Sequence, residues 1–170
     1  EQLALIDNNK RLNYRQLEIR TNQLASALKN LGFHQWSHIA IQGSNCAELA
    51  EVEIACYKAG YVKVPVNARL SIEETMHVLN DSEAVVIIAG KAQANAIMAQ
   101  RDKLPHLKTV ISIASAVGDI AYDNLLKTGQ DDFASVNPID NNIAVLHYTS
   151  GSSGVVKAAV QSYGNRRAMV

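Results

Sequence analysis

The side chains best suited to chemistry lie in one segment near the C-terminal end, Tyr148 to Lys157, with the sequence YTSGSSGVVK (the Gly/Ser segment). Backbone N–H groups in such a loop can form a concavity that binds an anion, and Gly151 and Gly154 allow close approach of the backbone. Lys157 adds a positive charge, and no acid is present. Further donors are the hydroxyls of Thr149, Ser150, Ser152 and Ser153. The combination suits a polyphosphate.

Two common nucleotide-binding motifs do not match this segment. A Walker loop has four residues between its first glycine and its Gly-Lys pair, followed by Ser or Thr. Here two residues separate Gly151 from Gly154, Lys157 follows three positions later, and Ala158 comes next. The dinucleotide fingerprint GxGxxG also fails. A Ser/Gly stretch is equally typical of a flexible surface loop, so the residues alone leave both interpretations open.

The elements around the Gly/Ser segment must position it. The apolar run Ile143–Leu146 predicts a buried strand that ends where the segment begins, with a loop from Thr149 to Val156. The run Ala84–Ala89 is too continuously apolar for a strand with one exposed face, which favours a parallel sheet covered on both faces. Ligands of such sheets bind beyond the carboxyl ends of the strands. The segment is therefore expected where a ligand would bind.

Strands and helices are expected to alternate along the chain. Predicted strands are 3–6 and 11–14, which form a hairpin, then 39–42, 61–66, 84–89, 109–114 and 143–148. Predicted helices begin after Asn13, after Ser44 or Asn45, and at Ser71, and cover 91–103 and 120–127. This order predicts an α/β fold: a doubly wound, mostly parallel sheet with helices on both faces.

The helix expected to end at Ala59 is largely apolar. We expect Glu48, Glu51 and Lys58 to lie on its exposed face. Two cysteines, Cys46 and Cys56, fall ten residues apart in this helix. At a rise of about 1.5 Å per residue they are too far apart for a disulfide, so free thiols are expected, consistent with a reducing cytoplasm.

Composition narrows the class of protein. The chain has 170 residues, is 48% hydrophobic, and has 16 basic and 16 acidic residues without a block of like charge. It can bury the core of one domain, and binding to nucleic acid or to an anionic membrane surface is not expected. No apolar stretch is long enough to span a bilayer, and we expect a cytoplasmic protein.

The Gly/Ser segment resembles the phosphate-binding signature of the adenylate-forming superfamily, which includes acyl-CoA synthetases, adenylation domains of peptide synthetases and luciferases. That signature is Tyr/Phe-Thr-Ser-Gly-Ser/Thr-Thr-Gly-x-Pro-Lys-Gly. Three positions differ: Ser153 replaces Thr, Val156 replaces Pro and Ala158 replaces Gly. The loss of Pro makes the loop less rigid, and Ala158 adds a Cβ where the backbone is expected to need an unusual conformation.

The resemblance extends over nearly the whole chain. It includes residues 4–17, 38–45 and 59–70, the last with Pro65-x-Asn67-x-Arg69-Leu70. Ser162 and Asn165 match the continuation of the signature, whereas Tyr163 replaces a histidine. We interpret Asn67 and Arg69 as structural. On this collinearity the chain is identified as similar to the N-terminal part of the AMP-binding domain of an acyl-CoA synthetase.

The resemblance implies a function. ATP and a carboxylic acid, expected to be a fatty acid from the similarity to the fatty-acid–CoA ligase branch, would form an acyl-adenylate and pyrophosphate, and the acyl group would pass to coenzyme A. The residues implied to hold the β- and γ-phosphates are Thr149, Ser150, Gly151, Ser152, Ser153, Gly154 and Lys157. Lys157 would be catalytic, and Thr149 or a neighbouring hydroxyl would help to place Mg²⁺.

The resemblance also implies that the acid pocket, the adenine contacts, the acidic metal ligand and the C-terminal domain lie beyond Val170, so residues 1–170 alone are expected to be inactive. Two alternatives stay open. One is an amino-acid-activating adenylation domain of a peptide synthetase. The other is a non-catalytic homologue with a binding role, which Val156, Ala158 and Tyr163 favour.

Overall fold

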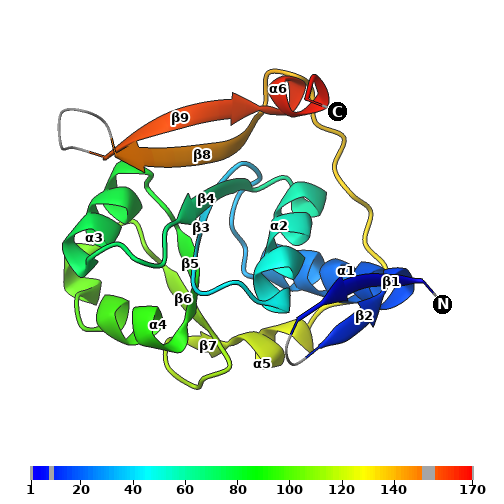
Figure 1. Cartoon of the computed structure of the whole chain (residues 1–170), viewed down its shortest axis with the longest axis horizontal. Coiled ribbons are helices and arrows are strands. Elements are labelled where there is room, and N and C mark those ends of the chain that lie inside the picture. The colour runs from blue at the N-terminus through cyan, green and yellow to red at the C-terminus, as the bar shows by residue number, and fades with distance from the viewer. Residues whose placement is uncertain (1, 8–9, 151–155, 170) are drawn as a thin grey trace.

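Alternating apolar and amphipathic segments build strands and helices in the computed structural model, which describes residues 2–7, 10–150 and 156–169 (Figure 1). The strands are β1 Leu3–Ile6, β2 Arg11–Asn13, β3 His38–Gln42, β4 Val62–Val66, β5 Val86–Gly90, β6 Thr109–Ile113, β7 Ile120–Ala121, β8 Ile143–Ser150 and β9 Val156–Ser162. The helices are α1 Tyr14–Asn30, α2 Ala47–Ala59, α3 Ile72–Asp81, α4 Lys91–Met98, the 3₁₀ helix η1 Arg101–Lys103, α5 Tyr122–Leu126 and α6 Tyr163–Arg167.

Seven of these strands form one sheet in the order β7-β6-β5-β3-β4-β8-β9, and β1 and β2 form a separate antiparallel pair. Neighbours in the large sheet are parallel except for β8 and β9, which pair as an antiparallel hairpin at its edge. The predicted α/β fold with a mostly parallel sheet is confirmed.

Helices cover both faces of the sheet. Figure 1 shows α3 and α4 on one side and α1, α2 and α5 on the other. Strand β5 explains the continuously apolar sequence of its region: Val86 and Ile88 belong to the core beneath α1 and α2, whereas Ile87 and Ala89 belong to the core beneath α3 and α4. Both sets are fully buried. The run Ala84–Ala89 predicted a parallel sheet covered on both faces, and this prediction is confirmed.

Two helices begin with capping boxes at the N-cap residues that their sequences predict. Asn13 and Gln16 exchange hydrogen bonds at the start of α1, and Ser71 and Glu74 do so at the start of α3. Helix α2 differs, because its N-cap residue is Cys46, which provides no side-chain cap. The predicted caps at Ser44 or Asn45 are therefore wrong.

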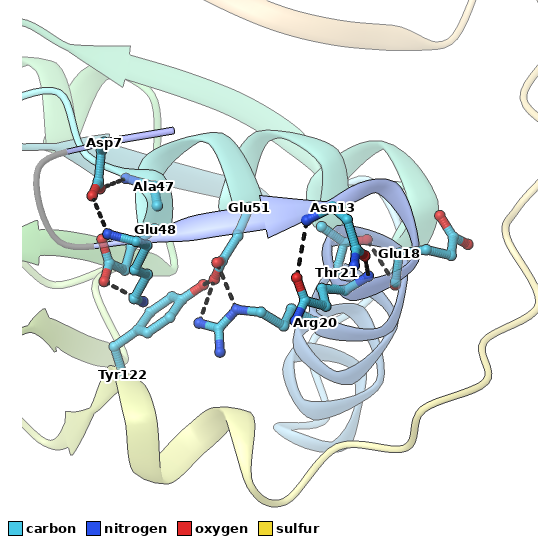
Figure 2. Close-up of polar contacts among 11 residues, drawn as sticks. Asp7, Asn13, Glu18, Arg20, Thr21, Ala47, Glu48, Glu51 and Tyr122 are labelled. Carbon is cyan, nitrogen blue, oxygen red and sulfur yellow. Dashed lines mark hydrogen bonds and ion pairs between the residues drawn. The ribbon is translucent and has the colours of Figure 1, made fainter. Parts of the chain in front are cut away.

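The cap of α2 comes instead from the β1–β2 hairpin. Asp7 Oδ2 accepts a hydrogen bond of 2.7 Å from the backbone N–H of Ala47 (Figure 2). A carboxylate at this end of a helix also complements its dipole. Both Cys46 and Cys56 are free thiols, as expected.

Three further boundaries differ from prediction. Helix α4 ends at Met98, and the chain turns through η1 before Leu104 and Leu107, which are buried in the core beneath α3 and α4. The segment 120–127 begins with the short strand β7 before α5 starts. Strand β9 was not predicted, since most of its residues are exposed and show no apolar alternation.

The prediction that Glu48, Glu51 and Lys58 form an exposed face of α2 is wrong: the side chains of Glu48 and Lys58 are only 14% and 12% exposed, and the largest difference is at Glu51. Its side chain is fully buried and forms two hydrogen bonds with Arg20, of 2.7 and 2.9 Å. The hydroxyl of Tyr122 donates a third, of 2.6 Å, to Glu51 Oε2 (Figure 2). Burial, followed by the nearby Glu51 carboxylate, raises the pKa of Tyr122 well above its usual value. Glu51 is thus the centre of a buried polar cluster that joins α1, α2 and α5.

Across the described ranges, no helix combines the length and the apolar character needed to cross a membrane.

Candidate functional site

The Gly/Ser segment joins the two strands of the edge hairpin. Thr149 and Ser150 continue β8, and Val156 and Lys157 begin β9. The predicted loop from Thr149 to Val156 is therefore shorter than expected, because both of its ends belong to the antiparallel ladder. The candidate residues Gly151, Ser152, Ser153 and Gly154 lie outside the described residues.

The ladder brings two candidate residues together. Thr149 and Lys157 are directly opposite each other in the register of β8 and β9, and both are exposed. Side chains opposite each other in such a ladder share one face, with Cβ atoms about 4.5–5.5 Å apart. A hydroxyl and an ammonium group can therefore contact the same anion at the end of the hairpin.

Two departures from the superfamily signature fit this geometry. Ala158 lies in β9 opposite Tyr148. Among the non-glycine residues that the structure describes, positive φ occurs at Trp36, Glu83 and Ala114, so Ala158 has ordinary extended backbone. The expectation of an unusual conformation at Ala158 is wrong. Val156 pairs with Ser150 and packs against the core beneath α3 and α4.

Strand β8 runs parallel to β4, so it ends at the same edge of the sheet as the other parallel strands. Turns that follow β3 and β4 at this edge form a depression of about 630 Å³. Its polar lining includes Ser44, Asn45, Glu53, Lys63, Asn67, Arg69 and Gln93. Ligands of α/β sheets bind outside the carboxyl ends of the strands, so the depression lies where the fold favours a ligand. Described residues of the Gly/Ser segment do not line it.

Asn67 and Arg69 have different surroundings, although we interpreted both as structural. Asn67 Oδ1 accepts a hydrogen bond of 2.9 Å from the backbone N–H of Arg69, and the Asn67 carbonyl accepts one of 3.2 Å from Gln42. These contacts agree with a structural role. Arg69 is exposed and lines the depression, where its guanidinium is available to an anionic ligand. The position of Arg69 just after a predicted strand was the signal that could have indicated this.

The segment after the hairpin forms an aromatic cluster. Ser162 and Asn165 form the capping box of α6, and Tyr163, the residue that replaces the histidine of the signature, begins this helix. The ring of Tyr163 makes edge-to-face contacts with Trp36 and Tyr57, at centroid distances of 6.0 and 5.9 Å. Burial raises the pKa of Tyr163 to about 12, so its phenol stays neutral. At the position where the superfamily signature has a histidine, this chain therefore has a tyrosine that packs in an aromatic cluster.

Comparison with known proteins identifies the family. A family model described as "AMP-binding enzyme" matches residues 1–170. The chain belongs to the AMP-binding enzyme family. The predicted resemblance to adenylate-forming enzymes is thus confirmed.

Relatives of this chain act on different acids. It is 32% identical over 163 residues to 2-succinylbenzoate–CoA ligase of Oceanobacillus iheyensis, an alignment that covers 94% of this chain and 30% of the relative. It is 27% identical over 169 residues to L-proline–[L-prolyl-carrier protein] ligase of Pseudomonas fluorescens, covering 99% and 33%. The chain thus spans about a third of the length of these curated relatives.

A solved structure supports the fold of the AMP-binding chain. The crystal structure of the anthranilate CoA ligase AuaEII in complex with anthranoyl-AMP superimposes with a TM-score of 0.90. The superposition covers 95% of this chain and 32% of AuaEII, at 23% sequence identity. At this identity the similarity establishes the architecture.

Proposed function

We propose that this chain is the phosphate-binding part of an ATP-dependent acid–thiol ligase. A carboxylate oxygen of the acid attacks the α-phosphorus of ATP, the bond from that phosphorus to the β-phosphate oxygen breaks, and acyl-AMP and pyrophosphate form. The thiol of coenzyme A then displaces AMP from the acyl carbon. Membership of the AMP-binding family and the CoA ligases among its relatives support this assignment.

One structural observation carries the proposal: Thr149 and Lys157 lie opposite each other at the end of the β8–β9 hairpin. When the bond at the α-phosphorus breaks, negative charge develops on the departing pyrophosphate. The ammonium of Lys157 would neutralise part of that charge, and donors held in place before the reaction stabilise it without reorganisation. The segment has no carboxylate that would repel the phosphates.

The other candidate residues have supporting roles in this proposal. Backbone N–H groups and hydroxyls from Ser150 to Gly154 would hold the β- and γ-phosphates. The hydroxyl of Thr149, or of a neighbouring serine, would ligate Mg²⁺ together with phosphate oxygens and water, as hydroxyl and phosphate oxygens suit this hard cation. Bound Mg²⁺ would supply additional charge neutralisation.

The remaining machinery belongs to other parts of the ligase. Residues 1–170 alone would not turn over ATP, because the acid pocket and the second, mobile domain are proposed to lie in further sequence. The relatives act on aromatic, aliphatic and amino acids, so the proposal specifies a carboxylic acid and no narrower substrate class.

A second candidate is activation of an amino acid for a carrier protein. The similarity to L-proline–[L-prolyl-carrier protein] ligase favours it, although at a lower identity than that to the 2-succinylbenzoate ligase. Both candidates share the adenylate-forming step. They differ in the thiol that accepts the acyl group. An assay that compares acyl transfer to coenzyme A with acyl transfer to a carrier protein would distinguish them.

The test uses a full-length ligase that contains this chain. Mg-ATP binding is measured by calorimetry, and acid-dependent exchange of pyrophosphate into ATP is measured with a panel of carboxylic acids. Lys157→Ala should lower kcat/KM by about 10²–10³-fold, the range seen when one preorganised donor is removed. Lys127→Ala is the matched control, because Lys127 is an exposed lysine at the end of α5. Unchanged exchange in Lys157→Ala would remove its catalytic assignment. A wild-type ligase that does not bind Mg-ATP would overturn the proposed function.

A further inference from the structure

Helix α3 contacts both strands of the hairpin that carries the Gly/Ser segment. The hydroxyl of Tyr148, in β8, donates a hydrogen bond of 2.6 Å to Asp81 Oδ2 at the end of α3. One turn earlier, His77 Nε2 lies 3.2 Å from the backbone carbonyl oxygen of Val156, the first residue of β9, so this ring nitrogen is the donor. His77 and Asp81 are four residues apart and therefore lie on the same side of α3.

These contacts are made near the two ends of the segment. Tyr148 comes three residues before Gly151, and Val156 comes two residues after Gly154. Figure 1 shows the described end of the hairpin lying against α3. Burial, followed by the hydrogen bond to Asp81, raises the pKa of Tyr148, so the phenol keeps the proton that it donates.

The hairpin presents its two faces to different surroundings. Tyr148 and Val156 pack against the core beneath α3 and α4. Successive side chains of a strand alternate between faces, so Thr149 and Lys157 point away from α3. Helix α3 thus contacts the back of a hairpin whose front carries the hydroxyl and the ammonium group.

The end of the hairpin needs support of this kind. The register between β4 and β8 pairs Lys63 with Val145, five residues before the end of β8 at Ser150. From there to Ser150 the ladder partner of β8 is β9. An isolated two-stranded hairpin is only marginally stable in water, so its end requires contacts from another element. In the described residues, the side chains of His77 and Asp81 provide polar contacts of this kind, in addition to the packing of Tyr148 and Val156 against the core.

We propose that Asp81 and His77 are positioning residues for phosphate binding: they hold Tyr148 and Val156 so that Thr149 and Lys157 face the β- and γ-phosphates of the nucleotide. This inference rests on the proposed function. It adds two residues of α3, far from the Gly/Ser segment in sequence, whose effect is exerted on ATP and not on the carboxylic acid.

The experiment uses the full-length ligase and five variants: Tyr148→Phe, Asp81→Ala, Asp81→Asn, His77→Ala and His77→Gln. For each, the Kd of Mg-ATP, the KM of ATP, the KM of the acid and the unfolding temperature are measured. Tyr148→Phe and Asp81→Ala should raise the Kd and the KM of ATP about 3–10-fold, the range for one lost hydrogen bond, and leave the KM of the acid unchanged. His77→Ala should have a smaller effect in the same direction.

Conservative variants separate positioning from other causes. Asp81→Asn keeps an oxygen acceptor and loses the charge, and His77→Gln keeps an N–H donor, so both should restore most of the ATP affinity. The double variant Tyr148→Phe/Asp81→Ala should bind ATP no more weakly than Asp81→Ala, since the two residues share one hydrogen bond. Glu73→Gln, at an exposed residue in the first turn of α3, is the matched control.

Two results would overturn the positioning role. One is a lower unfolding temperature with an unchanged Kd of Mg-ATP, which is what a purely structural contact predicts. The other is a parallel rise in the KM of ATP and of the acid. If Asp81→Ala does not fold, Tyr148→Phe decides, because it removes a single hydroxyl. A wild-type ligase that fails to bind Mg-ATP would instead refute the proposed function, so the two failures are distinguishable.

Discussion

The polar contacts around Glu51 and those around Asp81 differ in burial, although both join elements far apart in sequence. Glu51 is fully buried, with Arg20 and Tyr122 both directed at its carboxylate. Asp81 and His77 are exposed, and each makes one contact with the edge hairpin.

Because the two sets of contacts differ in burial, we expect one to determine the stability of the fold and the other to determine the position of the hairpin. A buried charge that loses its partner carries a large desolvation cost, whereas an exposed polar contact contributes little to the free energy of unfolding. The Glu51 cluster should therefore control whether α1, α2 and α5 stay packed. The α3 contacts should affect mainly where the hairpin lies, and thus ligand binding.

The largest expected effect tests the buried cluster. Glu51→Ala leaves the Arg20 guanidinium and the Tyr122 hydroxyl without their acceptor. The free energy of unfolding, measured by denaturant titration, should fall by about 3–5 kcal/mol, the range for breaking a buried ion pair on one side.

An ion pair with an exposed carboxylate provides the matched control for Glu51→Ala. Glu18, whose side chain is 64% exposed, pairs with Lys58 across the same two helices. Glu18→Ala should change the free energy of unfolding by at most about 1 kcal/mol. Equal losses in the two variants would show that burial does not distinguish them, and the comparison between the two regions would fail.

Features governed by local sequence were predictable. The capping boxes at Asn13 and Ser71 involve residues three positions apart. The continuously apolar sequence of β5 indicates that both faces of this strand are covered. Glu51 was not predictable, since its partners Arg20 and Tyr122 are 31 and 71 residues away. A charged residue on a helix predicts exposure unless such partners are known.

The candidate site shows the same limit. The Gly/Ser segment was recognised from its residues, but the register that places Thr149 opposite Lys157 depends on β9. That strand is exposed over most of its length, and Val160 within it is 57% exposed, so no apolar alternation indicated it. The contacts of Tyr148 and Val156 with α3 span 67 and 79 residues and were likewise not predictable.

A cap that crosses between elements should have an intermediate effect. Asp7 accepts hydrogen bonds from the backbone N–H groups of Ala47, at the start of α2, and of Lys10, within its own turn. Asp7→Ala should lower the free energy of unfolding by about 1 kcal/mol, as for other helix caps. Asp7→Asn keeps one of the two acceptor oxygens and should recover part of this loss. An unchanged midpoint in Asp7→Ala would show that the Asp7 cap does not stabilise α2.

The smallest expected effect is a dependence on pH at the border of the buried cluster. Burial acts to raise the pKa of Glu48, but the hydrogen bond from Lys10 acts in the opposite direction, and together with further hydrogen bonds it holds the pKa below the usual 4.5. A carboxyl group whose pKa is lower in the folded state stabilises the fold above its unfolded pKa, and this contribution is lost as the pH falls through the folded pKa.

Glu48→Gln isolates that contribution, because glutamine keeps the shape and does not titrate. The difference in free energy of unfolding between wild type and Glu48→Gln should be under about 1 kcal/mol near pH 6 and should shrink as the pH falls below 4.5 and Glu48 becomes protonated. A difference that stays constant over this range would mean that the Lys10 contact adds nothing through charge. The loss of free energy of unfolding is expected to decrease from the Glu51 variant to the Asp7 variant to the Glu48 variant. This order would then reflect hydrogen bonding and packing alone.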